Sequence, residues 1–160
     1  MGWRGLKLQA RQDNFMQILV AEDDRTSRWA LEAILKKAGY EVIATSNGKE
    51  AWQAMQVENP PPLALVDWMM PGMDGLEFCR KVRKSAALSS TYIIFLTNKR
   101  QKDDHIVAIE SGANDYICKP FDRKELLIRL HVAEGLIEAF NNNITKGSCP
   151  VLSPSLSSKS

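Results

Sequence analysis

The sequence predicts an α/β fold, in which helices cover both faces of a parallel sheet. Short and continuously apolar runs, typical of strands buried on both faces, alternate five times with segments of helical periodicity. Each connection between consecutive runs is long enough to hold a helix, as a crossover between parallel strands requires. No segment occurs twice, so a repeat architecture is excluded.

The first half of the chain supplies three strands and two helices. Gly39 lies where a glycine commonly ends a helix, and Asn47 is a candidate N-cap for the next one. Three prolines at 60–62 then break the helical pattern. The expected elements are a strand at 18–21, a helix at 25–38, a strand at 42–44, a helix at 47–57 and a strand at 63–66.

The second half continues the alternation and ends in a long helix. Gly112 ends the fourth helix, and apolar residues from Leu126 to Ile137 recur at helical spacing in the fifth. The expected elements are a helix at 74–84, a strand at 92–96, a helix at 102–111, a strand at 115–118 and a helix at 122–140. We therefore expect one domain at 16–140, between a polar N-terminal extension at 1–15 and a flexible, serine-rich tail at 141–160.

The composition of the chain argues against several classes of function. The chain has 160 residues, 44% of them hydrophobic, which suits one domain with one core. Its formal net charge of +2 does not indicate a dedicated partner of nucleic acid or of a membrane surface. No apolar run approaches the ~20 residues of a membrane span, and no secretory signal is evident, so we expect a cytoplasmic location. The three cysteines and two histidines lack zinc or histidine-metal spacings.

Charged and hydroxyl side chains follow four of the five predicted strands. In open parallel sheets, ligands bind beyond the carboxyl ends of the strands. If the first, third, fourth and fifth strands are neighbours, their trailing side chains converge there. These side chains are Glu22, Asp23 and Asp24 after the first strand, Asp67 after the third, Thr97 after the fourth and Lys119 after the fifth.

This set of side chains favours phosphoryl chemistry assisted by a metal ion. Two carboxylates about 4 Å apart repel each other by roughly 4 kcal/mol at an effective dielectric of 20, so three together favour a divalent cation. Oxygen ligands of this kind suit Mg²⁺. The cation and Lys119 would attract a phosphoryl group, which Asp67 could accept as an aspartyl phosphate. Thr97 could bond a phosphoryl oxygen in that state alone and draw the following loop inward.

Taken singly, each of these residues has a plainer explanation. Asp24 could simply cap a helix, Asp67 could be structural, Thr97 could be an N-cap, and Lys119 with Pro120 could form a turn. It is their joint occurrence at four strand ends that favours a site. Of the neighbouring residues, we expect Trp68 to be partly exposed, His105 and His131 to lie on helix surfaces, Tyr116 to be either a switch residue or a core aromatic, and Cys118 to be an inert buried thiol.

Four motifs resemble those of the receiver domain of two-component response regulators. They are Ile-Leu-Val-Ala-Glu-Asp-Asp at 18–24, Asp-Trp-Met-Met-Pro-Gly-Met-Asp-Gly at 67–75, Leu-Thr at 96–97 and Gly-Ala-Asn-Asp-Tyr-Ile-Cys-Lys-Pro-Phe at 112–121. They stand in the family's order and spacing. The resemblance implies a flavodoxin-like, doubly wound sheet of five parallel strands with five helices. The strand order 2-1-3-4-5 is that of the chemotaxis receiver and does not come from the residues.

The resemblance also implies a role for each site residue. The metal ligands of Mg²⁺ would be Glu22, Asp23, Asp67 and the backbone carbonyl of Met69. The Lys119–Pro120 bond would be cis, which only an X-Pro pair adopts at low cost. The remaining roles are Asp67 as phosphoacceptor, Thr97 as switch hydroxyl, Lys119 as phosphate-binding ammonium and Tyr116 as the aromatic that moves inward on activation.

The function implied is that of a phosphorylatable signalling domain. A histidine kinase or phosphotransfer protein would supply the phosphoryl group, and the face of the fourth helix, fifth strand and fifth helix would bind an output protein or domain. The domain would catalyse only its own phosphoryl transfer and slow autodephosphorylation. Met69 cannot orient an attacking water, and Lys99 adds a cation near the site, so we expect both to shield the phosphoryl group.

Two other functions fit these residues less well. A phosphatase of the Asp-x-Asp type would lack its general acid, because Met69 occupies the second position. A flavin carrier would need an amide-lined phosphate loop where three acids stand. Two alternatives stay open. The chain could be a receiver fragment of a larger regulator, for example one with a nucleotide cyclase or another output domain, or a constitutive dimerisation module with a silent site. A homodimer is also among the expected assemblies.

Overall fold

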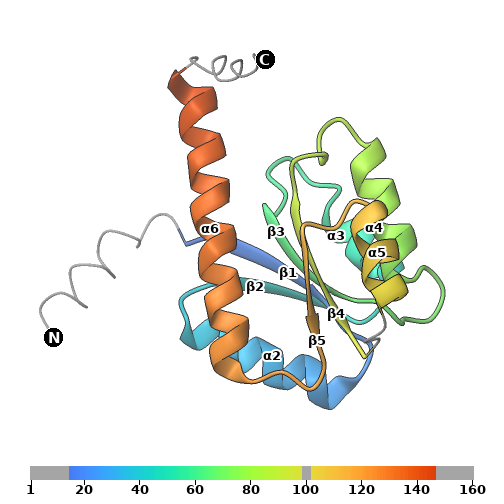
Figure 1. Ribbon diagram of the computed structural model, residues 1–160. Helices are drawn as coiled ribbons and strands as arrows, with labels where there is room; N and C mark the ends of the chain where they lie inside the picture. Colours follow the sequence, from blue (N-terminus) through green and yellow to red (C-terminus); the bar gives the residue numbers. More distant parts are fainter. Residues whose placement is uncertain (1–14, 99–101, 147–160) are drawn as a thin grey trace, which may run out of the picture. The chain divides into compact units, whose positions relative to one another are not determined.

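The computed structural model describes residues 15–98 and 102–146. Five parallel strands form one sheet in the order β2-β1-β3-β4-β5, as the resemblance implied (Figure 1). Together with the five helices of the described residues, they make the flavodoxin-like, doubly wound fold. The strands are β1 (Gln17–Ala21), β2 (Glu41–Thr45), β3 (Leu63–Asp67), β4 (Tyr92–Thr97) and β5 (Asp115–Cys118); the helices are α2 (Arg25–Lys37), α3 (Gly48–Ala54), α4 (Gly75–Lys84), α5 (Lys102–Glu110) and α6 (Arg123–Lys146).

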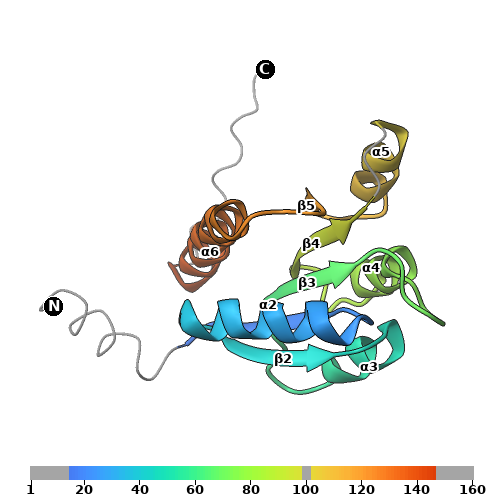
Figure 2. The same ribbon diagram turned by 90° about the horizontal axis from the view of Figure 1, so that it is seen from below.

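The sheet is covered on both faces, which explains why its central strands are apolar throughout. All five residues of β3 are buried, and so are all but the first residues of β1 and β4. Figure 2 shows α3, α4 and α5 on one side of the strands and α2 on the other. Successive strand residues point to opposite faces, so both sides need apolar partners. On the α3–α5 side, the core includes Leu19, Val66, Phe78, Val82, Phe95 and Ala108.

Helix boundaries follow the capping residues that the sequence predicts. The Asn47 side chain accepts a hydrogen bond from the backbone N–H of Glu50, and so begins α3. Gly39 and Gly112 follow α2 and α5 with φ values of +100° and +110°, the left-handed conformation that favours glycine. The two glycines therefore end these helices as expected.

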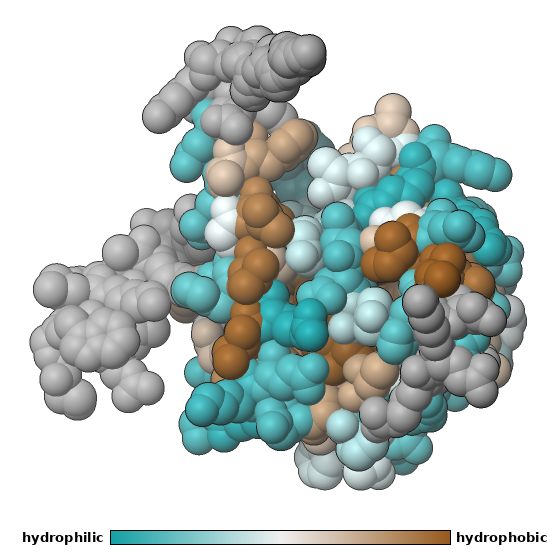
Figure 3. Space-filling view, in the orientation of Figure 1, coloured by the Kyte–Doolittle hydropathy of each residue, from teal (hydrophilic) through white to brown (hydrophobic). Residues whose placement is uncertain are grey.

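The helix α6 is longer than the sequence suggested. It continues to Lys146, six residues beyond the expected end at Phe140, because neither glycine nor proline interrupts the intervening residues. The chain divides into two compact units between Arg123 and Lys124, so nearly all of α6 belongs to the second unit. A row of exposed apolar side chains runs along it (Figure 3). The row consists of Ile128, Val132, Leu136 and Phe140.

The predicted extension at 1–15 and tail at 141–160 lie largely outside the described residues, as does Lys99. Among the helices of the described ranges, none combines the length and apolar composition that crossing a membrane would require.

Candidate functional site

Side chains from three strands meet at the carboxyl edge of the sheet. In the register of β1 and β3, Ala21 lies opposite Val66, so the next residues, Glu22 and Asp67, are neighbours. On the other side of β3, Thr97 of β4 lies opposite Cys118 of β5, and Lys119 follows directly. The parallel sheet thus brings together residues that are far apart in the sequence, as the pattern of strand ends predicts.

The Lys119 ammonium group joins the two buried carboxylates. Its Nζ atom lies 2.9 Å from Glu22 Oε1 and 3.0 Å from Asp67 Oδ2. Glu22 is 1% exposed and Asp67 is 7% exposed, so both ion pairs are shielded from solvent. Charge-assisted hydrogen bonds of this length fix the lysine over the carboxyl oxygens. The positive charge of Lys119 is therefore held against the carboxyl oxygens of both acidic residues.

A third carboxylate adds to the negative charge of the cluster. Oxygen atoms of Glu22, Asp23 and Asp67 all lie within 4.8 Å of one another, and Asp23 is exposed to solvent. When all three are ionised, they carry two more negative charges than Lys119 balances. Asp24 takes no part in this group, because its side chain caps α2 by accepting a hydrogen bond from the Ser27 N–H at 2.8 Å. The plainer explanation of Asp24 is thus the correct one.

The pKa shifts reflect this crowding. Burial raises the pKa of Glu22, and the neighbouring Asp67 raises it further, although the hydrogen bond from Lys119 works in the opposite direction. Burial alone would lower the pKa of Lys119, but its hydrogen bonds to Glu22 and Asp67 outweigh that effect and raise it. Lys119 therefore stays charged. A further cation at the site would stabilise the ionised form of Glu22.

The loop after β3 shapes the surroundings of Asp67. The Met69 backbone N–H donates to Asp67 Oδ1 with an N···O distance of 3.4 Å, and Met69 is 60% exposed. Gly75 begins α4 so close to the strand end that a Cβ atom there would lie 2.7 Å from the Asp67 carbonyl oxygen. Only glycine permits this approach, so the motif at 67–75 also fixes where the helix starts.

Trp68 is buried, not partly exposed as its place beside a polar site suggested. Its exposed fraction is 6%, and its ring packs against Phe95 with a centroid distance of 5.8 Å. The expectation was wrong because successive residues of an extended chain point to opposite faces, so Trp68 points away from the Asp67 side and its indole lies in the core with Val66. The indole therefore occupies the core directly behind the strand end that carries Asp67.

Thr97 and Tyr116 lie on the strands next to the acidic cluster. Thr97 is 1% exposed, and its carbonyl oxygen accepts a 2.7 Å hydrogen bond from the Lys119 N–H. Tyr116 is half-buried, and its ring stacks on His105 of α5 with a centroid distance of 4.1 Å. His105 is half-buried on α5, and its Nε2 atom lies 3.6 Å from Cys118 Sγ. Cys118 is half-buried and not fully buried as expected. The Lys119–Pro120 bond is cis.

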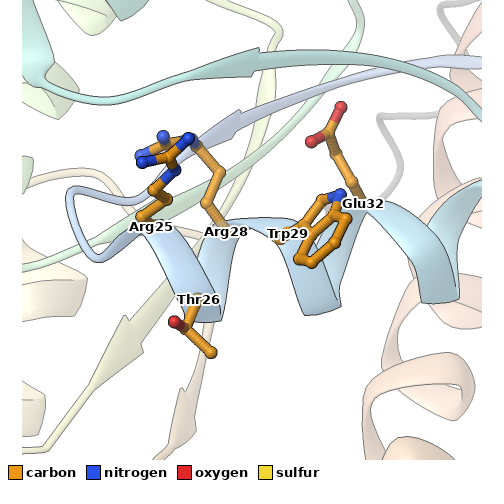
Figure 4. A pocket seen from close by; sticks show the side chains of 5 residues that line it. All are labelled: Arg25, Thr26, Arg28, Trp29 and Glu32. Carbon is orange, nitrogen blue, oxygen red and sulfur yellow. The ribbon is translucent and has the colours of Figure 1, made fainter.

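A shallow pocket beside the acidic cluster was missed by the sequence analysis. It has a volume of about 550 Å³, and five side chains of α2 line it (Figure 4). Trp29 is 76% exposed there, and the Arg28 Nη1 atom donates a 2.9 Å hydrogen bond to the Glu22 carbonyl oxygen. Two arginines three residues apart, with a tryptophan next to them, were the available sign. The lining residues are Arg25, Thr26, Arg28, Trp29 and Glu32.

Comparison with known proteins places this site in a family. Residues 18–131 match the family described as the response regulator receiver domain. The phosphate regulon transcriptional regulatory protein PhoB of Pseudomonas aeruginosa is 39% identical over 113 residues, which are 71% of this chain and 49% of that protein. A putative response regulator of Chloroflexus aurantiacus has a similar structure, with a TM-score of 0.69, 36% identity and coverage of 73% of this chain and 95% of that one.

A second similar structure includes a metal ion. It is the receiver domain of a sensor histidine kinase of Pseudomonas aeruginosa, solved with a magnesium ion coordinated in its active-site cleft. Its TM-score is 0.67, its identity is 30%, and the match covers 72% of this chain and 94% of that one.

The chain belongs to the response regulator receiver domain family of two-component systems. It is thus a domain of signalling proteins and not a classical enzyme. The chain spans about half the length of PhoB and of GltR, two Pseudomonas aeruginosa regulators that it matches.

Proposed function

We propose that Asp67 accepts a phosphoryl group from a histidine kinase or phosphotransfer protein in a Mg²⁺-dependent reaction, and that the phosphorylated domain controls a partner or effector. The observation that carries this proposal is the Lys119 ammonium group held 2.9 Å from Glu22 and 3.0 Å from Asp67 inside an acidic cluster. A complete arrangement of this kind argues against a silent dimerisation module. The free thiols of Cys79 and Cys118 suit a cytoplasmic location.

The donor atoms fit a magnesium ion. Glu22, Asp23 and Asp67 supply hard oxygen ligands within 4.8 Å of one another, and Asp23 is open to solvent, from which waters can complete an octahedron. The Met69 carbonyl is the fourth expected protein ligand. When bound, the ion would neutralise charge on the phosphoryl oxygens during transfer.

The chain's own residues supply orientation and charge. An Asp67 carboxylate oxygen attacks phosphorus, an O–P bond forms, and the P–N bond to the donor histidine breaks, so that the imidazole leaves with the bonding pair. The Lys119 ammonium group neutralises charge on the phosphoryl oxygens as the transfer proceeds. Its two present bonds preorganise it for this task, because it needs only to exchange a carboxylate oxygen for a phosphoryl oxygen.

The response to phosphorylation is proposed to pass through Thr97 and Tyr116. Thr97 ends β4 one strand away from Asp67, so its hydroxyl is within reach of a phosphoryl group by a small loop movement. Tyr116 lies on the neighbouring strand and on the same face as Thr97. The surface around Tyr116 on β5 and α5 would then differ between the two states, and an output protein or domain would read that difference.

The test is phosphorylation by a small-molecule donor. The protein is incubated with acetyl phosphate and Mg²⁺, its intact mass is recorded, and its tryptophan fluorescence is followed. We expect the mass of one phosphoryl group, which chelation of Mg²⁺ prevents and Asp67→Asn abolishes. The same label in Asp67→Asn, located by peptide mass on another residue, would contradict the assignment of Asp67.

A further inference from the structure

A histidine and a cysteine surround the aromatic ring that the proposed function assigns to the switch. His105 of α5 stacks on Tyr116 with a ring-centroid distance of 4.1 Å and an interplanar angle of 26°. The His105 Nε2 atom lies 3.6 Å from Cys118 Sγ. The imidazole of His105 thus contacts two side chains of β5, Tyr116 and Cys118.

The strand register places this group next to Thr97. Tyr116 lies opposite Phe95, and Cys118 lies opposite Thr97 in the parallel pair β4–β5. Paired residues of parallel strands share a face, and so do residues two apart on one strand. Phe95 and Tyr116 pack in the core on the α3–α5 side, which fixes the face. The imidazole of His105 therefore covers the stretch of β5 between the Thr97 level and the Tyr116 ring.

We propose that His105 is a positioning residue that holds Tyr116 in its resting place through this stack. The inference rests on the proposed function, because it assumes that Tyr116 moves inward once Thr97 engages a phosphoryl group. A ring that moves inward must leave the imidazole. The stack therefore stabilises the resting state alone.

A contact present in only one of two states shifts the equilibrium between them by its own strength. An aromatic pair contributes enough to change such an equilibrium about two- to tenfold. Removing the imidazole should raise the population of the inward Tyr116 conformation before phosphorylation. By linkage, the same change should tighten the binding of any phosphoryl analogue at Asp67 by the same factor.

The experiment uses beryllofluoride with Mg²⁺ as the phosphoryl analogue and ¹⁹F NMR of protein labelled with 3-fluorotyrosine. The chain has three tyrosines, so three resonances are expected, and Tyr116→Phe assigns the one of interest. In the wild type, we expect the Tyr116 resonance to move on addition of the analogue. In His105→Ala, it should lie part of the way to that position already, and the beryllofluoride midpoint should fall about two- to tenfold.

Two variants separate positioning from a general effect on the fold. His105→Phe retains a stacking ring and should restore the resting resonance and the wild-type midpoint. Ile106→Ala truncates the next residue of α5, whose side chain is 45% exposed, and should change neither. If His105→Ala does not fold, as judged by circular dichroism, His105→Gln removes the ring with less loss of volume and carries the same expectations.

The experiment distinguishes a failure of the His105 role from a failure of the proposed function. If the wild type does not bind beryllofluoride, the phosphoacceptor assignment fails and the inference fails with it. If the wild type binds the analogue but its Tyr116 resonance does not move, or if His105→Ala has the wild-type resonance and midpoint, only the role of His105 is overturned. A shifted resting resonance and a lower midpoint in His105→Ala, both reversed in His105→Phe, support it.

Discussion

Two cationic side chains lie at opposite ends of the sheet, and the groups that surround their charges differ. At the carboxyl end, Lys119 is paired with the carboxylates of Glu22 and Asp67. At the amino end, Arg83 of α4 is surrounded by neutral oxygen atoms. It donates to the carbonyl oxygens of Gly112 at 2.8 Å, Thr91 at 2.7 Å and Ser89 at 3.0 Å, and to Asn114 Oδ1 at 2.7 Å.

This difference suits Arg83 to a structural role and Lys119 to a site that responds to a ligand. Burial lowers the pKa of Arg83, yet a guanidinium group stays charged, and its bonds to backbone oxygens leave nothing for a ligand to exchange. At the carboxyl end, three carboxylates face one ammonium group, so unbalanced negative charge is left that a metal cation could neutralise. The amino end therefore fixes the loops that precede β4 and β5, and the carboxyl end is the one that we propose changes state.

The largest expected effect comes from Lys119→Met. The substitution keeps most of the length of the side chain but removes the charge that would face the phosphoryl oxygens. Loss of one preorganised electrostatic group of this kind costs about 10²- to 10³-fold in rate. We therefore expect the initial rate of phosphoryl uptake from acetyl phosphate, followed by intact mass, to fall by that factor.

The control for this variant is Lys36→Met. Lys36 lies in the last turn of α2, exposed, and its partner is Glu32 at 3.6 Å. Loss of such a surface pair costs little. A Lys119→Met protein that takes up phosphate as fast as Lys36→Met would remove the distinction between the two ends of the sheet.

The second-largest effect is expected for a substitution of Arg83, which should lower the stability of the fold and leave the rate of phosphoryl uptake unchanged. Arg83→Met leaves the carbonyl oxygens of Gly112 and Thr91 without their charged donor. Unpaired buried acceptors of this kind cost about 1–3 kcal/mol, so we expect the free energy of unfolding to fall by about 2–3 kcal/mol. Urea denaturation measures the loss. The rate of phosphoryl uptake at a temperature where the variant is folded should stay at the wild-type value, and a tenfold slower rate would show that the two ends are coupled.

The sequence could predict the carboxyl end far better than the amino end, for a physical reason. Glu22, Asp67 and Lys119 directly follow apolar strands, so the periodicity that predicts the strands also places them. The partners of Arg83 are mostly backbone carbonyl oxygens up to 29 residues away, as for Gly112, and no side-chain pattern marks a carbonyl group. Sequence spacing likewise could not show that Trp68 turns into the core, since that depends on packing against Phe95.

A substitution of Gly112 perturbs the Arg83 site at the amino end of the sheet less than the loss of Arg83 itself. The φ of +110° at Gly112 disfavours any other residue, and a Cβ atom there would lie 2.6 Å from Arg83 Cγ. Strain of this kind costs about 1–2 kcal/mol. We expect Gly112→Ala to lower the thermal midpoint accordingly. Gly135→Ala is the matched control, because its Cβ would meet open space in a helix and should be neutral or stabilising. Equal midpoints for the two variants would argue against a strained turn at Gly112.

The smallest effect should concern how long the phosphoryl group persists. Met69 is 60% exposed beside Asp67, and its thioether cannot hold an attacking water in line with phosphorus. Met69→Asn supplies an amide that can, and one such hydrogen bond is worth about 1 kcal/mol. We expect the phosphorylated form, prepared with acetyl phosphate and freed of excess donor, to lose its phosphoryl group about three- to tenfold faster.

Met69→Leu is the control, because it changes the shape of the side chain and leaves it apolar. Its half-life should match that of the wild type. Uptake should be similar in all three proteins, since Lys119 and the carboxylates are unchanged. Equal half-lives in Met69→Asn, Met69→Leu and the wild type would mean that Met69 does not shield the phosphoryl group. The carboxyl end would then control entry of the phosphoryl group through Lys119 without controlling its loss through Met69.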